Sequence, residues 1–394
     1  MDQELAKLLL VEGGTFVFLG VPQETQFGID MQCWNTDEDF RGIKMIPPGL
    51  HYVHYSAVSK KTGDVSPRSG FMHYFHKKDF LVKMWDKTLE DISKDEISEE
   101  SIQRLKDNLL NIDRHLAPYP YEIWEKWKLL TSQITAELAQ RLSPESGVIR
   151  TSVELLSMSD EDRPRGVKST EPQESSTSQE VQGDSTPGQS DPKRIKRITQ
   201  AEMEDALLPK LKPVPGTSMR FTEIPREKHP PGATPGEITK HYLDQSYTLG
   251  MMIAQHDGPL HLIGELQFAY LCFLIGHSLE AFEHWKNLVI LLCSCDEAIH
   301  KYRSLFFHFI RTIEVQIEEM PEEFLADIVM NKNLVYKKLR DFFRTAYLSK
   351  VNGQLLTMIE SFKKKLTEKL QWDFTELDVD EEDERPVIVK LQQT

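Results

Sequence analysis

Short runs of β-branched and aromatic residues, closed by turn-forming residues, dominate the first 90 positions of the chain. They lie at 14–22, 49–58, 70–75 and 80–85, and each has the length and composition of a strand. Only the sequence HKKD separates the last two runs, which predicts a β-hairpin between them. The pattern therefore predicts a small antiparallel β-domain.

The spacing of apolar residues changes after this β-rich part. Apolar residues recur at three- and four-residue steps over 102–116 and again over 123–138, with a break at the sequence APYPY. Two amphipathic helices joined by a short break favour a helical hairpin that packs on the sheet. We therefore predict a β-rich α+β domain over residues 1–150.

A long helical pattern begins at residue 233. Thr234, Pro235 and Glu237 have the spacing of a capping box with proline at the first helical position. Helices are then expected at about 235–255, 260–275, 278–293, 297–318, 322–330, 335–350 and 354–370. We predict an all-helical domain over 233–375, with Trp372 and Phe374 capping its core.

The segments around this helical domain have a different composition. Residues 159–192 contain no aromatic residue, and Val167 and Val181 are their only aliphatic residues. Such a segment buries too little apolar surface to offset the entropy of ordering, so we predict a flexible, disordered linker over 151–213. An extended connector over 214–232 and an acidic tail over 376–394 complete the predicted organisation.

Charge and cysteine content narrow the function classes. The net charge is 47 − 62 = −15, which disfavours general affinity for phosphate backbones and favours a basic protein partner. We expect no direct, specific nucleic-acid binding. Four cysteines in 394 residues give no disulfide framework, so a reducing compartment is expected. No apolar run reaches the roughly 18 residues of a membrane helix, and the N-terminus does not have the pattern of a signal peptide.

Histidine and cysteine pairs are the candidates for a metal site. His51 with His54, and His73 with His76, are three apart on predicted strands, where alternation sends the members of a pair to opposite faces. Cys293 and Cys295 lack a second pair, so core positions are the favoured interpretation. The common catalytic and nucleotide-binding motifs are missing, and the carboxylates of the helical domain resemble solvated faces. We expect no cofactor, no metal and no enzymatic activity.

One helical pair, in the sequence around Gly276, Ala281 and Trp285, has the spacing of a tetratricopeptide unit. A solenoid needs about three such units, and only one is found. A tight helical hairpin is the favoured interpretation, with close approach at Gly276 and with core positions at Phe268, Leu271, Phe282 and Trp285. A helical peptide-binding adaptor with a groove near Trp285 remains the alternative.

A short basic cluster ends the predicted linker. It consists of Lys193, Arg194, Lys196 and Arg197. Such a cluster on a flexible chain is a candidate nuclear-localisation signal, and it is equally consistent with a solubilising linker.

The tail contains apolar residues that its acidic surroundings do not explain. After the acidic run at 378–384 come Pro386, Val387, Ile388, Val389, Lys390 and Leu391. A lone strand is unstable in water, so it either frays or adds to the edge of a sheet. That edge could belong to the N-terminal domain of this chain or to another protein, and we expect a partner's sheet.

Several stretches together resemble the Aar-two splicing-factor family. They are FGID from Phe27, FRGIKMIPPGLHYVHYS from Phe40, PYPY from Pro118, GATPGEITKH from Gly232, GELQFAYLCFLIGHSLEAFEHWKNLVILLC from Gly264, and the closing LQWDF and VIVKL. The resemblance covers both predicted domains and the tail, and leaves out the linker. It implies a β-rich N-terminal domain and a helical C-terminal domain similar to the VHS superhelix.

The resemblance also implies a function, that of an assembly chaperone of the U5 small nuclear ribonucleoprotein. The family binds the Prp-eight scaffold at its RNase H-like and endonuclease-like domains, and its tail adds a strand that ties them together. Here the tail strand corresponds to residues 386–391. The bound factor holds off the Brr-two helicase and RNA, it moves from cytoplasm to nucleus, and phosphorylation favours its release.

Three further expectations follow. The protein is expected to be monomeric on its own. The linker serines are candidate phosphorylation sites, among them Ser175, Ser176, Ser178, Ser185 and Ser190. A hydrolase is the third function class, and no residues are nominated for it.

Overall fold

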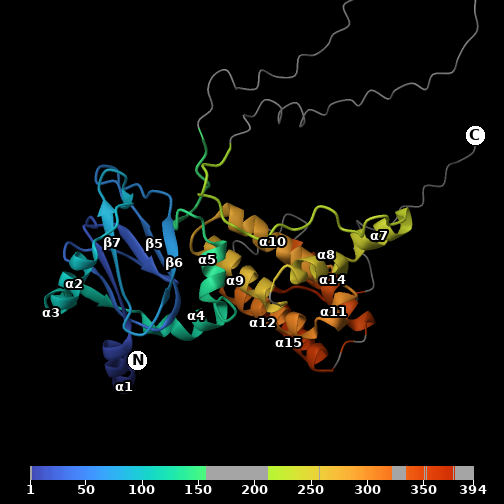
Figure 1. Ribbon diagram of the computed structural model, residues 1–394. Coiled ribbons are helices and arrows are strands. Elements are labelled where there is room, and N and C mark those ends of the chain that lie inside the picture. Colours follow the sequence, from blue (N-terminus) through green and yellow to red (C-terminus); the bar gives the residue numbers. More distant parts are fainter. Residues whose placement is uncertain are drawn as a thin grey trace, which may run out of the picture. The chain divides into compact units, whose positions relative to one another are not determined.

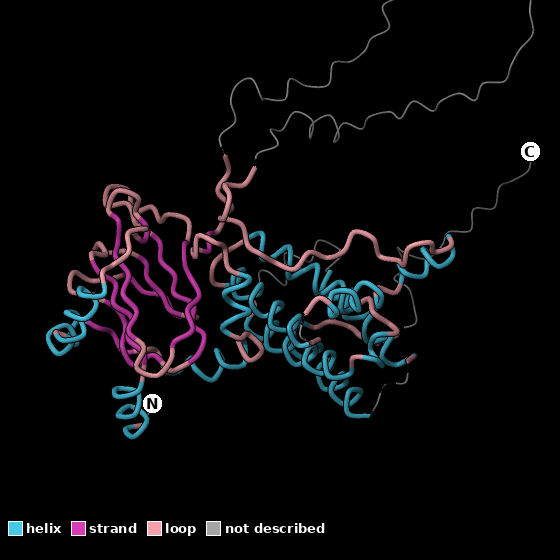
Figure 2. The backbone as a smooth tube through the Cα atoms, in the orientation of Figure 1, coloured by secondary structure: helices cyan, strands magenta, loops and turns pink. Residues whose placement is uncertain are grey.

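The computed structural model describes residues 2–156, 212–256, 258–321, 334–349, 351, 353–375 and 377. Strands occupy the N-terminal part of the chain and helices dominate the C-terminal part, as Figures 1 and 2 show. This division confirms the predicted fold class for the ordered parts. The predicted disorder over most of the linker and the strand in the tail lie outside the described residues.

The N-terminal part contains two five-stranded sheets. Sheet A has the strand order β8-β7-β1-β4-β9, and sheet B has the order β10-β6-β5-β2-β3. The strands are β1 Gly14–Leu19, β2 Gln26–Ile29, β3 Gln32–Asn35, β4 Gly42–Ile46, β5 Gly49–Ser56, β6 Ser69–Phe75, β7 Phe80–Asp86, β8 Asp91–Ile92, β9 Leu116–Pro118 and β10 Ile149–Arg150. A short helix, α1 (Gln3–Glu12), precedes them, with the Asp2 side chain as its N-cap.

Alternation along β1 explains how sheet A is covered on both faces. Phe16 and Phe18 point into the aromatic core between the sheets, where they meet Phe27 of β2. Val17, between them, points the other way and packs beneath α2 (Glu99–Asp107) and α3 (Leu109–Ile112). The helices contribute Ile102, Leu105, Leu109 and Ile112, which are the apolar positions of the predicted helical period.

The hairpin predicted between the third and fourth strand runs is wrong. β6 pairs with β5 and β10 in sheet B, whereas β7 pairs with β1 and β8 in sheet A. The HKKD connection therefore crosses from one sheet to the other. The domain is also mixed rather than antiparallel, because β1 with β7 and β4 with β9 are parallel pairs. Alternation predicts a strand but does not say which sheet receives it.

The predicted helical hairpin is also wrong. Strand β9 lies between its two halves, and the second half forms α4 (Trp124–Leu130) and α5 (Ala136–Leu142). These two helices pack on the sheet B side, away from α2 and α3 on sheet A. Each segment covers a different sheet because each sheet has one apolar face outside the shared core.

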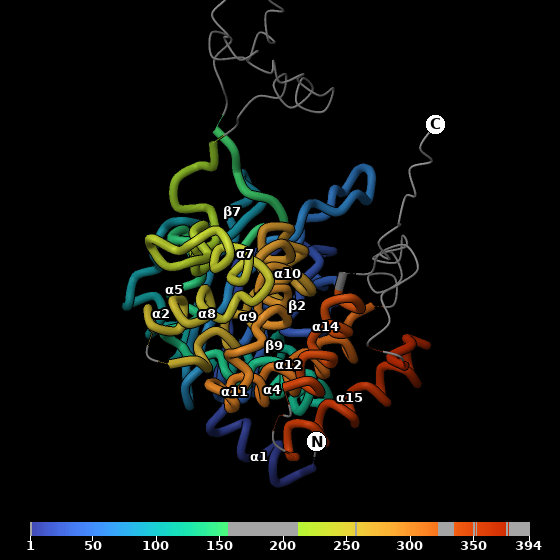
Figure 3. The backbone as a smooth tube through the Cα atoms, turned by 90° about the vertical axis from the view of Figure 1, so that its right-hand side faces the viewer, coloured from blue at the N-terminus to red at the C-terminus, as the bar shows by residue number. Residues whose placement is uncertain are grey.

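The helical part follows the predicted spacing closely. Its described helices are α7 Pro235–Leu243, α8 Ser246–Ala254, α9 Leu260–Leu274, α10 Leu279–Cys293, α11 Ala298–Lys301, α12 Arg303–Glu319, α14 Leu334–Leu348 and α15 Gly353–Leu370. The capping box at Thr234 is confirmed. Two predicted helices are each divided, one at Asp244 and one at Tyr302, and the helix predicted at 322–330 lies outside the described residues. The turned view shows α15 beside α14 and α12 (Figure 3).

One hydrophobic core joins the helical part to sheet B. It includes Leu50 and Tyr52 of β5, Trp127 and Leu130 of α4, and the buried faces of α9, α10 and α12. Gly276 lets β5 approach, because a Cβ there would stand 2.4 Å from the Tyr52 hydroxyl. Gly264 does the same for α4–α5, because a Cβ would stand 2.3 Å from the Gln133 carbonyl oxygen. Gly276 does permit a close approach, but of β5 and not of the second helix as predicted. Phe268, Leu271 and Trp285 are fully buried as predicted, whereas Phe282 is only partly buried.

Residues Glu154–Pro215 form a separate unit, of which only the two ends are described. Leu155 pairs with Pro213 in an antiparallel bridge, and the Leu156 amide donates to the Lys212 carbonyl at 2.8 Å. Over the described ranges, no helix combines the length and apolar character needed to cross a membrane. The domain boundaries proposed from the sequence remain predictions.

Candidate functional site

The two site predictions from the sequence fall on parts of the chain that the structure does not describe. Residues 386–391 of the tail and the basic cluster at Lys193, Arg194, Lys196 and Arg197 lie outside the described residues. Both therefore stay predictions. The described residues do show how the tail begins, and they contain a polar cluster that the sequence analysis missed.

Residues 371–375, the last described stretch before the tail, are fixed to α14. Phe374 is buried against Phe343, and Trp372 packs edge-on to Tyr336. The Tyr336 hydroxyl donates to the Asp373 carbonyl at 2.6 Å. The prediction that Trp372 and Phe374 cap the helical core is confirmed, so the tail starts from a fixed point.

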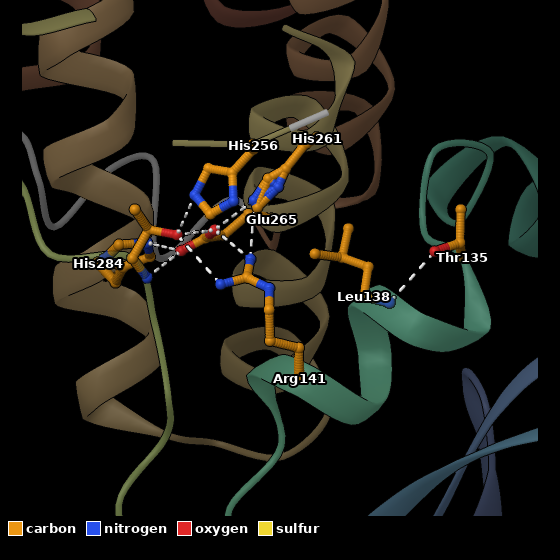
Figure 4. A network of polar contacts seen from close by, with 8 residues as sticks. Thr135, Leu138, Arg141, His256, His261, Glu265 and His284 are labelled. Carbon is orange, nitrogen blue, oxygen red and sulfur yellow. Dashed lines mark hydrogen bonds and ion pairs between the residues drawn. The ribbon is translucent and has the colours of Figure 1, made fainter. Parts of the chain in front are cut away.

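The missed cluster surrounds Glu265, a carboxylate on the buried face of α9. Its side chain is fully buried, which contradicts the prediction that the carboxylates of the helical domain are solvated. Three other segments supply its partners: Arg141 from α5, Thr222 from the connector and His284 from α10. The cluster therefore joins the N-terminal region, the connector and the helical domain (Figure 4).

Every oxygen of the Glu265 carboxylate is satisfied. Oε1 accepts from His284 Nε2 at 2.8 Å and from the Thr222 amide at 2.6 Å. Oε2 accepts from the Thr222 hydroxyl at 2.7 Å and from Arg141 Nη2 at 3.2 Å. A buried charge needs such partners, because an unpaired carboxylate in this environment costs several kcal/mol.

Two opposing effects set the pKa of Glu265. Burial is the largest and by itself would raise the pKa, but the hydrogen bond and charge of His284, with the two Thr222 hydrogen bonds, lower the pKa to about 2. The group is therefore ionised at neutral pH and acts as a fixed anion. A permanently ionised, fully bonded carboxylate is suited to holding segments together and not to transferring protons.

A pocket opens beside this cluster. It has a volume of about 710 Å³ and is lined by Arg141 and Leu138 of α5 and by His256, Pro259 and His261 at the start of α9. Arg141 Nη2 also donates to His261 Nε2 at 2.7 Å, so this nitrogen acts as the acceptor. Within the described ranges, no three His, Cys, Asp or Glu side chains are grouped to hold a metal ion.

A second buried carboxylate, Asp30, lies inside the N-terminal sandwich. It accepts from His51 Nδ1 at 2.7 Å, from the Tyr119 hydroxyl at 2.6 Å and from the Tyr52 amide at 2.9 Å. His51 Nε2 faces the Pro47 carbonyl at 2.8 Å. Burial, followed by the charge of Asp30, raises the pKa of Tyr119 far above its usual range. Asp30, His51 and Tyr119 are all sealed from solvent, so a substrate cannot reach this triad.

Two other predicted features also have positions in the structure. Trp285 is fully buried and donates from Nε1 to Gln316 Oε1 at 2.9 Å, so Trp285 itself cannot contact a bound peptide, and the adaptor with a groove near it stays a prediction. Cys293 and Cys295 are buried in the core, as predicted. Burial raises the pKa of both thiols, which disfavours the thiolate that a metal would require.

Comparison with known proteins gives matches to both ordered regions. A family model described as the AAR2 N-terminal domain matches residues 12–144, and one described as the AAR2 C-terminal repeat region matches residues 221–375. The human protein "Protein AAR2 homolog" is 37% identical over 394 residues, which cover 99% of this chain and 97% of the relative. The mouse protein of the same name is also 37% identical with the same coverage. The Caenorhabditis elegans protein is 34% identical over 375 residues, covering 95% of this chain and 98% of the relative.

Proposed function

The chain belongs to the AAR2 family, and from this premise we propose that it is an assembly chaperone of the U5 small nuclear ribonucleoprotein. Family membership supports a splicing-related role and association with spliceosomal components. The observation that carries the proposal is the match of both domains, in order, along nearly the whole chain.

The partner in this proposal is the Prp-eight scaffold, bound at its RNase H-like and endonuclease-like domains. The tail segment at residues 386–391 adds a strand to the scaffold, and the bound protein blocks the Brr-two helicase and RNA until maturation. The action is by occupancy, with no chemistry. Two observations support binding by the tail: its apolar run has alternating faces, and its acidic run suits a basic partner.

The fixed start of the tail adds a physical reason for strand addition. Because Phe374 and Asp373 are held on α14, the strand is tethered to a body that can also contact the scaffold. Tethering turns the second contact into an intramolecular event with a high effective concentration. A short strand of modest intrinsic affinity then contributes strongly to the whole interaction.

Location and release are part of the same proposal. The protein joins the scaffold in the cytoplasm and leaves it in the nucleus, with the basic cluster at 193–197 as the candidate import signal. Phosphates on linker serines add negative charge to a chain whose net charge is already −15, and they weaken docking by repulsion from acidic surfaces. Glutamate substitutions throughout the linker serines are expected to reduce recovery of the scaffold.

A truncation pulldown from cytoplasmic and nuclear extracts tests the proposal. The full chain is compared with a chain that lacks residues 386–394 and with a control that lacks only 392–394. We expect the first deletion to reduce recovery of one very large scaffold protein by about tenfold or more, which is about 1.4 kcal/mol of binding. The control should bind as the full chain does, and the melting temperatures of all three should be nearly the same. Equal recovery with and without residues 386–391 would refute tail binding.

A hydrolase remains the function to distinguish. It would show turnover that survives tail deletion, and the Asp30 triad is the arrangement among the described residues that most resembles catalytic machinery. Because that triad is sealed from solvent, it does not support a hydrolase.

A further inference from the structure

One edge of sheet B is only partly covered. Strand β5 pairs with the whole of β6, but on the other side β10 pairs only with Ser69 and Gly70. Over the parts of the chain that the structure describes, no strand pairs with residues 71–75 on that side. A row of open backbone donors and acceptors is a template for another strand.

The backbone groups that face this open edge can be identified. The Thr151 amide donates to the Arg68 carbonyl at 3.2 Å, so Arg68 and Gly70 direct their hydrogen-bonding groups towards β10. Antiparallel pairing alternates, so Met72 and Tyr74 direct their amide and carbonyl groups the same way. Phe71, His73 and Phe75 bond to β5 instead. The open edge therefore offers two amides and two carbonyls in a straight row.

A groove runs along these groups. It has a volume of about 590 Å³ and lies between β6 and α5, which are neighbours in Figure 1. Its lining is mixed: Leu50, Met72, Ala136 and Ala139 give it an apolar part, and Gln140, Ser143, Glu145 and Arg220 give it a polar part. A turn that contains Gly147, with a φ of +71°, leads into β10. Because β10 starts only after this turn, it does not cover the edge at residues 71–75.

We propose that this groove is a strand-binding site, and that in the free protein its occupant is residues 386–390 in the tail of the same chain. The tail strand runs antiparallel to β6, with Val387 opposite Tyr74 and Val389 opposite Met72. Both valines then face the groove. The proposal rests on the proposed function only in treating residues 386–391 as a strand.

The sequence of the segment fits this register. Pro386 falls opposite Phe75, whose hydrogen bonds go to β5, so the missing amide of proline is not needed there. In the register shifted by one residue, Ile388 and Lys390 would face the groove in place of the two valines. After Val389 only Lys390, opposite Phe71, remains before β10 occupies the edge, so the pairing has a natural end.

The position of the tail's start gives the strand its direction. Lys369, at the end of α15, donates to the Glu318 carbonyl at 2.7 Å, and the next residue, Glu319, pairs with Lys126 of α4 at 2.8 Å. Beside Lys126, Trp127 Nε1 donates to the Leu50 carbonyl at 2.6 Å, and Leu50 is the register partner of Tyr74. The end of α15 is thus linked to the Tyr74 end of the groove, where an antiparallel strand has to begin.

Length and charge agree with this path. The 12 residues from Phe374 to Pro386 span up to about 40 Å when extended. On entering the groove, the acidic run at 378–384 would pass the turn after β6, which carries Lys77 and Lys78. While the tail segment occupies this edge, neither the edge nor the apolar segment is free to pair with other chains. The segment leaves when it pairs with a partner's sheet instead.

A disulfide test on the purified chain, with no scaffold present, examines the proposal directly. In the double variant Tyr74→Cys/Val387→Cys, oxidised glutathione should form an intramolecular disulfide between positions 74 and 387, because facing residues of such a pair are about 5.5 Å apart between Cα atoms. Val387→Cys alone is the matched control. In this control, the exposed cysteine among the native ones is Cys33, on β3 at the other edge of sheet B. We expect no disulfide between position 387 and Cys33. Failure of positions 74 and 387 to cross-link, a bond from position 387 to Cys33, or a dimer between chains would each overturn the proposal.

A peptide measurement covers the case in which cysteine at position 74 disturbs the edge. A labelled peptide of residues 385–392 should bind the chain that lacks 386–394, as measured by fluorescence anisotropy. Met72→Pro removes one outward amide and should weaken binding at least tenfold, whereas Met72→Ala keeps the amide and should weaken it less than threefold. Equal binding by the two variants would exclude the edge. If the docked fraction is about nine-tenths, Met72→Pro in the full chain should also tighten scaffold binding about tenfold.

Discussion

The two buried carboxylates of this protein do different work. Asp30 bonds to His51, Tyr52 and Tyr119, which all belong to the N-terminal region, so it fixes one part of the sandwich. Glu265 bonds to His284, 19 positions away in the chain, and to Arg141, 124 positions away. One carboxylate organises a domain, and the other holds three segments of the chain together.

The difference shows how the two regions form one body. Gln267, two residues after Glu265, accepts from the Gln133 amide at 2.8 Å and donates to the Leu129 carbonyl at 3.2 Å. Together with Gly264, these residues make one face of α9 a polar, closely fitted seam against α4–α5. Such a seam keeps the β-rich region and the helical region at a fixed spacing.

Replacing Glu265 is expected to have the largest effect. Glu265→Gln keeps the shape but removes the charge that His284 and Arg141 face, and a broken buried ion pair costs about 3 to 5 kcal/mol. Chemical denaturation should show this loss in the free energy of unfolding. Glu283→Gln, on an exposed part of α10, is the matched control and should change the free energy by less than about 0.5 kcal/mol. A Glu265→Gln protein as stable as the control would mean that the seam does not depend on this charge.

Closing the space at Gly264 should have a smaller effect. A Cβ at this position would stand 2.3 Å from the Gln133 carbonyl oxygen and 2.5 Å from Leu138 Cδ2, so Gly264→Ala forces α5 away from α9. Overpacking of this kind costs about 1 to 3 kcal/mol, partly offset by the better helix propensity of alanine. Gly236→Ala in α7 adds the same atom where nothing lies within 4 Å, and it should leave stability unchanged or slightly higher. If both variants unfold at the same denaturant concentration, the space at Gly264 is not as restricted as the close approach implies.

The seam also marks what could and could not be predicted from the sequence. Periodicity located α9, α10 and α15 to within a few residues, because long apolar stripes and caps are local signals. It did not predict that β6 and β7 enter different sheets, or that α4 and α5 share a core with helices more than 100 residues away, because both depend on non-local packing. Glu265 did leave a signal: it is the one acidic residue in the mostly apolar run from Leu260 to Leu274, and a carboxylate on a buried helix must have partners.

Mild acid should have the smallest effect on stability of the three changes, and it should act mainly through His54. His54 of β5 is buried beside Tyr52, and burial, aided by the positive charge of Arg68, lowers the pKa of His54 to about 3. A lowered pKa means that this stability is complete above the unfolded value of 6.5 and is lost as the pH falls from 6.5 towards 3. Between pH 7.5 and 5.5 the expected loss is about 1 kcal/mol, and a further loss from Glu265 begins below its unfolded value of 4.5.

Unfolding free energies at pH 7.5 and 5.5 measure this step. His54→Gln removes the titrating group, so its stability should change less between the two pH values, even if it is lower at both. His300→Gln, at an exposed position in α11, should keep the dependence of the unmodified chain. If the pH dependence survives in His54→Gln, the acid sensitivity comes from groups other than His54. Its loss would assign the acid sensitivity to His54 on sheet B, and not to the carboxylate of Glu265.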